Sequence, residues 1–212
     1  MKKLLLIIAV VALMANISTA QENEIDKREN MQFGLKAGIN NSNVYDTEGD
    51  DFNADSKFGF AGGLFVSIPI GFYFGIHPEI LFSQKGFKAT GAILGSTYDF
   101  TRTTNYVDVP ILFSLKPSEF ITILAGPQYS YLISSRDVFS NATTTIATET
   151  EFENDNIRKN TFCFTAGLDI NINHIVVGGR VGWDLMKNNG DGTSLTPRYK
   201  NVWYQATLGY RF

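Results

Sequence analysis

The sequence predicts an all-β fold, an eight-stranded antiparallel up-and-down transmembrane β-barrel. Three observations predict this fold. Apolar and polar residues alternate with period two in eight segments, the connections between these segments alternate in length, and charged residues avoid one face of every segment. Period-two alternation is the pattern of a strand whose two faces meet different surroundings. Together the three observations indicate a closed sheet with one apolar and one polar surface.

The chain begins with the three parts of a secretory signal peptide, at residues 1–20. Two lysines form a positive start, and an apolar run of eleven residues follows at Leu4–Met14. A run of this length fits a signal peptide and is too short to cross a bilayer as a helix. Small residues precede the cleavage site that we expect between Ala20 and Gln21. An uncleaved anchor helix is the alternative.

The expected mature chain is acidic and holds one domain. A short polar lead at residues 21–30 precedes a barrel domain at residues 31–212. Without the two leader lysines, 16 Lys and Arg stand against 21 Asp and Glu, a net charge of −5. This balance argues against a nucleic-acid partner. The single cysteine, Cys163, excludes an intrachain disulfide framework.

Eight segments combine the alternation with a high content of aromatic and β-branched residues, which favour strands. They are Met31 to Asn40, Phe58 to Ile68, Phe72 to Lys85, Tyr98 to Leu115, Phe120 to Ser134, Thr161 to Ile170, His174 to Leu185 and Tyr199 to Phe212.

The connections between the eight segments alternate between long and short. The three short ones are Pro69 to Gly71, Lys116 to Glu119 and Asn171 to Asn173; the four long ones are about Asn41 to Lys57, Gly86 to Thr97, Ser135 to Asn160 and Met186 to Arg198. Outer-membrane barrels show this asymmetry, with short periplasmic turns and longer external loops. An even number of strands then leaves both termini on the periplasmic side.

Charge placement decides which face meets lipid. A soluble lipocalin-like barrel exposes its polar face, whereas a membrane barrel turns that face inward. In the apolar stripes only Asp99 and Lys200 are charged, both at the loop-end margin. A Lys or Arg that faces lipid at the midplane costs ~2–4 kcal/mol, so the apolar stripes face lipid. The opposite stripes carry most strand glycines and the charges of Lys36, Glu79, Lys85, Arg102, Asp108, Asp169, Arg180, Asp184 and Arg211.

A charge network is expected inside the barrel. Lys36, Glu79, Asp108 and Arg180 fall near mid-height on the inward face, and Arg211 is the fifth expected member. Buried charges are costly unless they pair, and eight strands enclose only enough space for side chains. The pattern therefore favours a charge-paired plug over the alternative, a proton or ion path.

No residue pattern indicates catalysis or a cofactor. The two histidines are His77, which shares the inward face with Glu79 and Ser83, and His174, which lies beside a short turn. A lipid substrate would not reach the inward face, so we expect no enzyme. The acidic segment Asp46–Asp55 could hold Ca²⁺, but it lacks the order of an EF-hand loop, which favours a solvated acidic loop.

Five short motifs carry a family resemblance. They are Phe33–Asn40, Pro78–Gly86, Tyr106–Leu112, Ala125–Tyr129 and the terminal Leu208–Phe212. From Met31 to its end the chain resembles the PorT-like outer-membrane β-barrel family of Bacteroidetes. The resemblance implies an eight-stranded barrel in the outer membrane of a Gram-negative cell. It also implies that Tyr210 and Phe212 belong to the signal read by the outer-membrane assembly machinery.

The founding member of that family belongs to a protein-secretion apparatus, so an accessory role in secretion is one alternative function. A narrow small-solute pore is another. The sequence favours the interpretation that the protein is an integral outer-membrane barrel with a side-chain-filled lumen. In this interpretation it acts as a structural or interaction protein through its external loops. Its expected partners are outer-membrane lipid, the assembly machinery and a protein bound at those loops.

Overall fold

The computed structural model describes residues 27–45, 54–93, 96–141, 145–151, 157–189 and 199–212. A short 3-10 helix, η2 (Lys27–Glu29), precedes the strands. The strands are β1 (Gln32–Tyr45), β2 (Ala54–Pro69), β3 (Phe74–Ile93), β4 (Ser96–Ser118), β5 (Ile121–Asn141), β6 (Thr145–Glu151), β7 (Asn160–Ile172), β8 (Ile175–Asp184) and β9 (Lys200–Arg211). No helix in these ranges has the length and hydropathy needed to cross a membrane.

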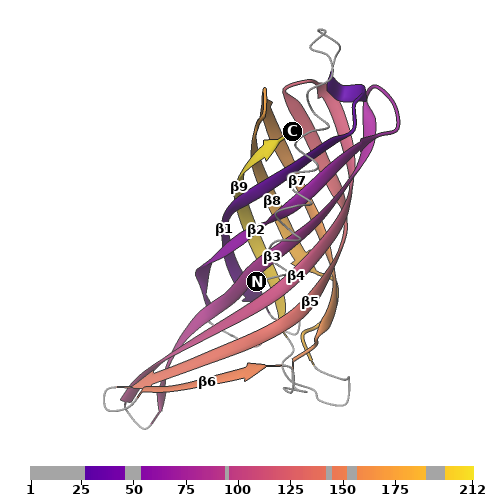
Figure 1. The fold of residues 1–212 in the computed structure, drawn as a ribbon. Coiled ribbons are helices and arrows are strands. Elements are labelled where there is room, and N and C mark those ends of the chain that lie inside the picture. The colour runs from indigo at the N-terminus through magenta and orange to yellow at the C-terminus, as the bar shows by residue number, and fades with distance from the viewer. Residues whose placement is uncertain (1–26, 46–53, 94–95, 142–144, 152–156, 190–198) are drawn as a thin grey trace, which may run out of the picture.

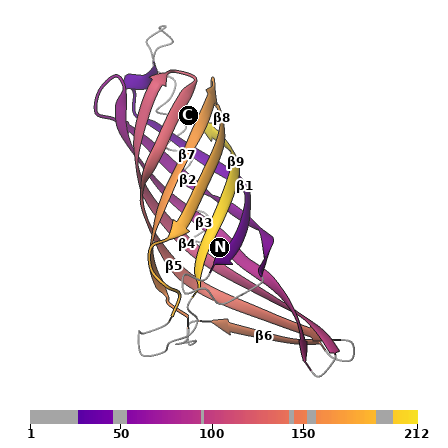
Figure 2. The ribbon, with the colours of Figure 1, turned by 180° about the vertical axis from the view of Figure 1, so that it is seen from behind.

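Eight of the strands close into a ring (Figures 1 and 2). The order in the sheet is β4-β3-β2-β1-β9-β8-β7-β5, every pair is antiparallel, and pairing of β4 with β5 closes the circle. β6 lies outside the ring and pairs with β5. The ring confirms the predicted eight-stranded up-and-down barrel.

Three tight turns join strands at one end of the barrel, here called the turn end. β4 and β5 are separated by two residues, as are β7 and β8. In the β7–β8 turn, Asn173 has a φ of 52°, a left-handed conformation that asparagine tolerates better than most residues. The β2–β3 turn is longer than predicted, because β2 ends at Pro69 and β3 begins at Phe74.

The two faces of the ring differ as the alternation predicts. Large apolar side chains such as Leu64, Phe113 and Leu208 are 54%, 69% and 60% exposed on the outer surface. Charged residues such as Lys36, Glu79 and Arg180 are buried on the inner surface. Apolar side chains outside and charged side chains inside are the reverse of the arrangement in a soluble protein, and lipid requires this reversal.

Glycines on the inner face make room for large side chains from neighbouring strands. A Cβ atom on Gly34 would lie 2.3 Å from the ring of Phe65, and one on Gly182 would lie 2.2 Å from the indole of Trp203. The predicted concentration of glycine on the inward stripes therefore reflects packing. Small positions alternate with large ones so that the narrow lumen is filled.

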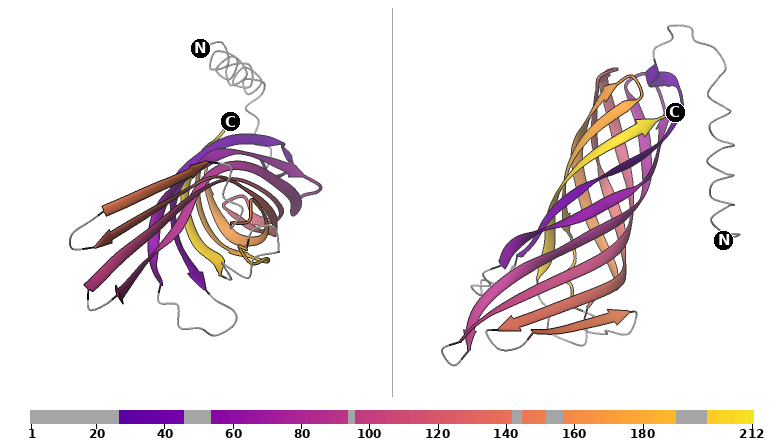
Figure 3. Two further views of the ribbon diagram at one scale, coloured as in Figure 1. Left: turned by 90° about the horizontal axis from the view of Figure 1, so that it is seen from below. Right: turned by 60° about the vertical axis from the view of Figure 1, so that its left-hand side comes forward.

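Three strands are much longer than a membrane requires. β3, β4 and β5 have 20, 23 and 21 residues, whereas about 9–11 residues suffice for a tilted membrane strand. Their outer parts pair with one another and with β6, and they project to one side of the ring (Figure 3). We call this sheet the arm; it comprises residues 87–93, 96–104, 135–141 and 145–151.

The arm corrects the predicted loop boundaries. Gly86 to Thr97 was expected to be a long loop, but β3 continues to Ile93 and β4 begins at Ser96. Much of the expected loop at Ser135 to Asn160 is likewise strand, in β5 and β6. The ladder of backbone hydrogen bonds continues beyond the barrel and overrides the weak strand propensity of the glycine and alanine residues there.

Irregular pairing marks the base of the arm. The register shifts between Ser56 and Ala61 in the β2–β3 pair, and between Asn105 and Tyr106 in the β4–β5 pair. At the same level Gly86 has a φ of 145°, and Ser42 Oγ hydrogen-bonds to its backbone. Bulges bend a strand and increase its twist, which explains why the arm leaves the direction of the barrel.

The packing of glycine against tryptophan gives a first prediction. Gly182→Ala should destabilise the folded barrel by about 1–3 kcal/mol, because the new methyl group overlaps the Trp203 indole. Gly179→Ala, on the same strand, is the control, since no atom lies within 4 Å of its Cβ position. Heat-dependent migration on gels measures the loss of the folded form. Equal melting of the two variants would refute the packing argument.

Candidate functional site

A cluster of four charged side chains lies in the lumen near the turn end. Lys36 Nζ on β1 is 2.5 Å from Glu79 Oε2 on β3, and Arg180 on β8 is 3.7 Å from Glu79 Oε1. Arg180 also donates two hydrogen bonds to Asp169 on β7, of 2.6 and 2.8 Å. Two cations and two anions balance, so this lower cluster can exist away from bulk water.

His77 and Phe65 pack beside the lower cluster. Their rings stack with centroids 5.1 Å apart, and His77 Nε2 is 3.3 Å from Glu79 Oε1. Phe65 is the side chain that occupies the space beside Gly34. One aromatic residue and one glycine therefore place the imidazole against the carboxylate.

A second charged pair lies nearer the loop end. Lys85 Nζ is 3.0 Å from Asp108 Oδ2, and the same ammonium lies 3.7 Å from the ring centroid of Trp203 and 4.8 Å from that of Tyr106. An ammonium held between a carboxylate and aromatic faces is stabilised by charge pairing and by cation–π attraction. All four side chains are buried.

Asp184 completes this upper cluster, and no described cation forms a salt bridge with it. Its Oδ2 accepts hydrogen bonds from Asn188 and from the backbone and side chain of Asn201, at 2.7–2.9 Å. Its Oδ1 accepts from Cys163 Sγ at 3.2 Å. These donors satisfy both oxygens of a buried carboxylate, and they also tie the end of β8 to the start of β9.

Neutral polar side chains fill the space between the two clusters. Gln205 donates to Asn40 Oδ1, and Asn40 donates to Ser83 Oγ, both at 2.9 Å. On the opposite wall Thr165 donates to Gln128 at 2.9 Å. Hydrogen-bonded side chains from both walls thus occupy this part of the lumen.

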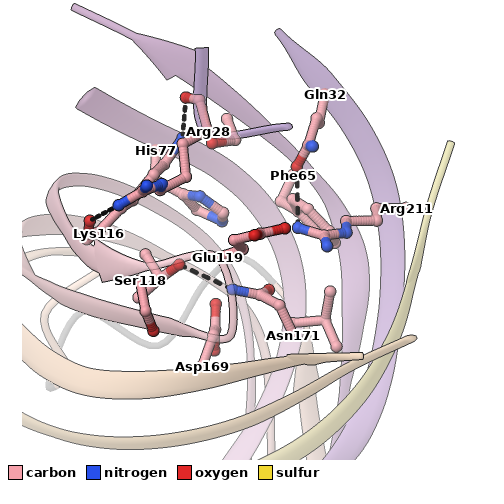
Figure 4. Close-up of a pocket in the computed structure, with 13 residues that line it drawn as sticks. Arg28, Gln32, Phe65, His77, Lys116, Ser118, Glu119, Asp169, Asn171 and Arg211 are labelled. Atoms are coloured by element: carbon pink, nitrogen blue, oxygen red, sulfur yellow. Dashed lines mark hydrogen bonds between the residues drawn. The ribbon is translucent and has the colours of Figure 1, made fainter. Parts of the chain in front are cut away.

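The turn end of the lumen is covered by the segment before β1. Arg28 lies 3.7 Å above the ring of Phe72 and donates to the carbonyl of Lys116 at 3.4 Å, while Lys116 Nζ donates to the Arg28 carbonyl at 3.2 Å. Beneath them is a pocket that reaches His77 and Asp169 (Figure 4). Its empty volume is about 450 Å³, which includes the space open to solvent at its mouth. The pocket stops at the lower cluster.

The loop end is covered by two segments that follow β6 and β8. Ile157 packs with Tyr106 and Leu132 in a buried apolar cluster and forms a bridge with Asn189. Arg158 donates to the carbonyl of Lys187 at 2.9 Å. Side chains therefore cover both ends of a lumen that is itself filled.

The sequence of this barrel matches one protein family over most of its length. The family described as "Outer membrane protein beta-barrel domain" matches residues 19–189. The chain belongs to this family. The outer membrane is therefore its location, and the lipid of that membrane surrounds the apolar surface of the ring.

Several solved structures are similar to this outer-membrane β-barrel domain at low identity. Ail of Yersinia pestis is 17% identical, with a TM-score of 0.46 over 85% of this chain and 98% of Ail. Neisserial surface protein A is 9% identical, with a TM-score of 0.46 over 85% and 97%. OprG of Pseudomonas aeruginosa is 12% identical, with a TM-score of 0.37 over 89% and 99%. No curated protein matches the chain.

The outer-membrane barrel domain brings three of the five expected network residues together. Lys36, Glu79 and Arg180 meet in the lower cluster, but Asp108 pairs with Lys85 in the upper one. The hydrogen-bonded row that contains Lys36 does pass through Asp108, by way of the register on β2 and β3. Because the strands are tilted, this row climbs the barrel and places Asp108 higher than expected.

Arg211 lies outside both clusters, which is a second correction. Its Nε donates to the carbonyl of Asn173 at 2.7 Å and its Nη1 to Gln32 at 3.1 Å. Arg211 is the last residue of β9, so its side chain reaches only the rim of the turn end. Asp169, which the sequence placed on the inward face, is the member of the lower cluster that the expected network lacked.

The arrangement of the histidines offers no nucleophile. Ser83 hydrogen-bonds to Asn40, and among the described residues no serine, threonine or cysteine is hydrogen-bonded to His77. His174 is exposed, stacks on Tyr210 and contacts the Arg211 carbonyl. In the described ranges no three acidic, histidine or cysteine residues are grouped to hold a metal ion. Most of Asp46–Asp55 lies outside those ranges, so the calcium question stays a prediction.

The lower cluster gives a second prediction. Glu79→Ala should destabilise the folded barrel by ~3–5 kcal/mol, because it leaves two buried cations with one counter-ion. Arg180→Ala should act similarly, since it leaves Asp169 without its partner. Thermal unfolding in detergent micelles measures both variants, with Glu119→Ala at the exposed turn end as the control. Unchanged melting of both lumen variants would mean that the cluster is not needed for stability.

Proposed function

We propose that this protein is a non-conducting, non-enzymatic outer-membrane barrel that presents its arm to a protein partner outside the cell. The observation that carries the proposal is the projection of four paired strands beyond a ring whose lumen is filled and covered. A pore would need a free path through the ring, and an enzyme would need reactive groups within reach of its substrate. The arm is the largest described element outside the ring.

The proposed orientation places the turn end in the periplasm. β1 begins and β9 ends at the turn end, where Gly34 pairs with Arg211. Short periplasmic turns and longer external strands and loops are the rule for this class of barrel. With this orientation both termini are periplasmic and the arm is extracellular.

The remaining sequence-based assignments are part of the same proposal. Residues 1–20 would direct export and be cleaved before Gln21, and Tyr210 and Phe212 would be read by the assembly machinery. Tyr210 stacks edge-on against Phe212 with ring centroids 5.3 Å apart, on the outer side of β9. The five motifs support membership of the PorT-like Bacteroidetes family, with a role as an accessory barrel in secretion as the alternative function.

The arm is suited to contact another protein. Tyr98 and Phe139 stack with centroids 5.2 Å apart, and both are partly exposed. Arg102 forms a two-pronged ion pair with Asp137 at 2.6–2.7 Å, which fixes β4 against β5. Aromatic side chains on a rigid support are common at the centres of protein interfaces.

The pore alternative gives a third prediction. The purified protein in planar lipid bilayers should show no steady open channel, because the lower and upper clusters block the lumen. A porin reconstituted in parallel shows that the membrane reports channels. A reproducible open state of porin size would overturn the proposed function in favour of small-solute passage.

The partner-binding role gives a fourth prediction. A photo-reactive phenylalanine at Tyr98 or at Phe139 should cross-link the same protein in intact cells of the native host. The control is Phe113, which faces lipid and is 69% exposed, and which should cross-link no such protein. The gel migration of the folded barrel verifies each variant. Absence of any protein cross-link from both arm positions would contradict the proposal.

A further inference from the structure

The arm ends in a strand with a free edge. β6 pairs with β5 from Ser140↔Thr145 to Ser134↔Glu151, and no other described strand pairs with it. An edge strand presents a row of backbone N–H and C=O groups that can pair with an added strand. Addition of an extended segment to such an edge is a general mode of peptide recognition.

The edge has few of the features that usually prevent strand addition. Natural edge strands are often protected by charged side chains, especially lysine, by proline or by a bulge, and of these β6 has only two glutamates. β6 has seven residues, none of them proline or lysine, and its register with β5 is unbroken. Three threonines and Ile146 favour the extended conformation, and Ile146 is 57% exposed.

The charges of β6 select among possible strands. Its only charged residues are Glu149 and Glu151, two positions apart. Arg136 stands opposite Glu149 on β5, whereas Ser134 stands opposite Glu151. A second copy of β6 would bring the same carboxylates and no basic residue, so self-pairing gains no charge attraction. A strand with basic residues two positions apart would match both glutamates, because opposite charges across strands attract.

We propose that β6 binds an extended basic segment of a partner protein as an added strand of the arm. This inference rests on the proposed function, since it requires the arm to be accessible outside the cell. Backbone hydrogen bonds along the seven residues would provide affinity, and the two glutamates would provide charge selectivity. An apolar residue of the partner could cover Ile146.

A defined peptide tests the inference on the full-length barrel in lipid nanodiscs. The probe is a fluorescent nine-residue peptide in which lysine alternates with valine or threonine. Fluorescence anisotropy measures the binding of three peptides: this lysine peptide, the same peptide N-methylated along one edge, and a counterpart with glutamate in place of lysine. Hydrogen–deuterium exchange of residues 145–151 reports whether the β6 backbone becomes protected.

The expected result is saturable binding of the lysine peptide alone, with slower exchange across residues 145–151. The double variant Glu149→Gln, Glu151→Gln should weaken binding about three- to tenfold. The matched control, Glu29→Gln with Glu119→Gln, removes two carboxylates at the turn end and should bind like the native protein. The charge-reversed variant Glu149→Lys, Glu151→Lys should prefer the glutamate peptide.

Three results would overturn the inference: equal binding of the N-methylated peptide, no protection of residues 145–151, or protection that rises with protein concentration in the absence of peptide. The last result would assign the edge to a second copy of this chain. The cellular cross-links from Tyr98 and Phe139 test partner binding by the arm independently of strand addition at β6. Cross-links without peptide binding at β6 would leave the proposed function intact and refute strand addition.

Discussion

The structure depends on the closure of eight strands into a narrow ring within lipid. In a bilayer the backbone finds hydrogen-bond partners only within the protein, and a closed ring leaves no unpaired edge. The outer surface must then be apolar, so polar side chains collect inside. Eight strands leave too little space for bulk water, and charged groups must pair with one another. The ion pair of Lys36 with Glu79 and that of Lys85 with Asp108 follow from this constraint.

The same constraint gives the ring a structural role and leaves the proposed function to the strands that extend beyond it. Two charged clusters occupy the lumen, with Arg28 over one end and Ile157 over the other, and in the proposed function these described side chains make the barrel rigid and block passage. Beyond the ring the strands no longer need to close, so β3, β4 and β5 can continue as an open sheet. An open sheet has free edges, and among the described residues of this chain one of them is the whole length of β6. The location of the proposed function is therefore a consequence of where the ring ends.

Alternation predicted the ring and the two faces, because lipid imposes a strict rule on every membrane strand. The stripe of β5 with Thr122 and Gln128 is buried, while that with Ile121 and Ile123 faces outward, as predicted. Side-chain partners were harder to predict, since strand tilt and stagger decide which inward residues share a height. For that reason Asp108 was assigned to the wrong cluster. Of the arm, the sequence predicted only the part of β4 from Tyr98 onward, because the other arm strands follow no strict apolar pattern.

The central claim is that the charges inside the barrel are paired with one another. Solid-state NMR in lipid bilayers can measure it directly, with ¹⁵N in the lysine side chains and ¹³C in the carboxyl groups of Asp and Glu. The account predicts strong nitrogen–carbon transfer from Lys36 to Glu79 and from Lys85 to Asp108, whose closest N···O distances are 2.5 and 3.0 Å. The signal between Lys36 and Glu79 is assigned by its loss in the Glu79→Gln variant. Absence of both signals in the native protein would show that the lumen charges are not paired and would contradict the account.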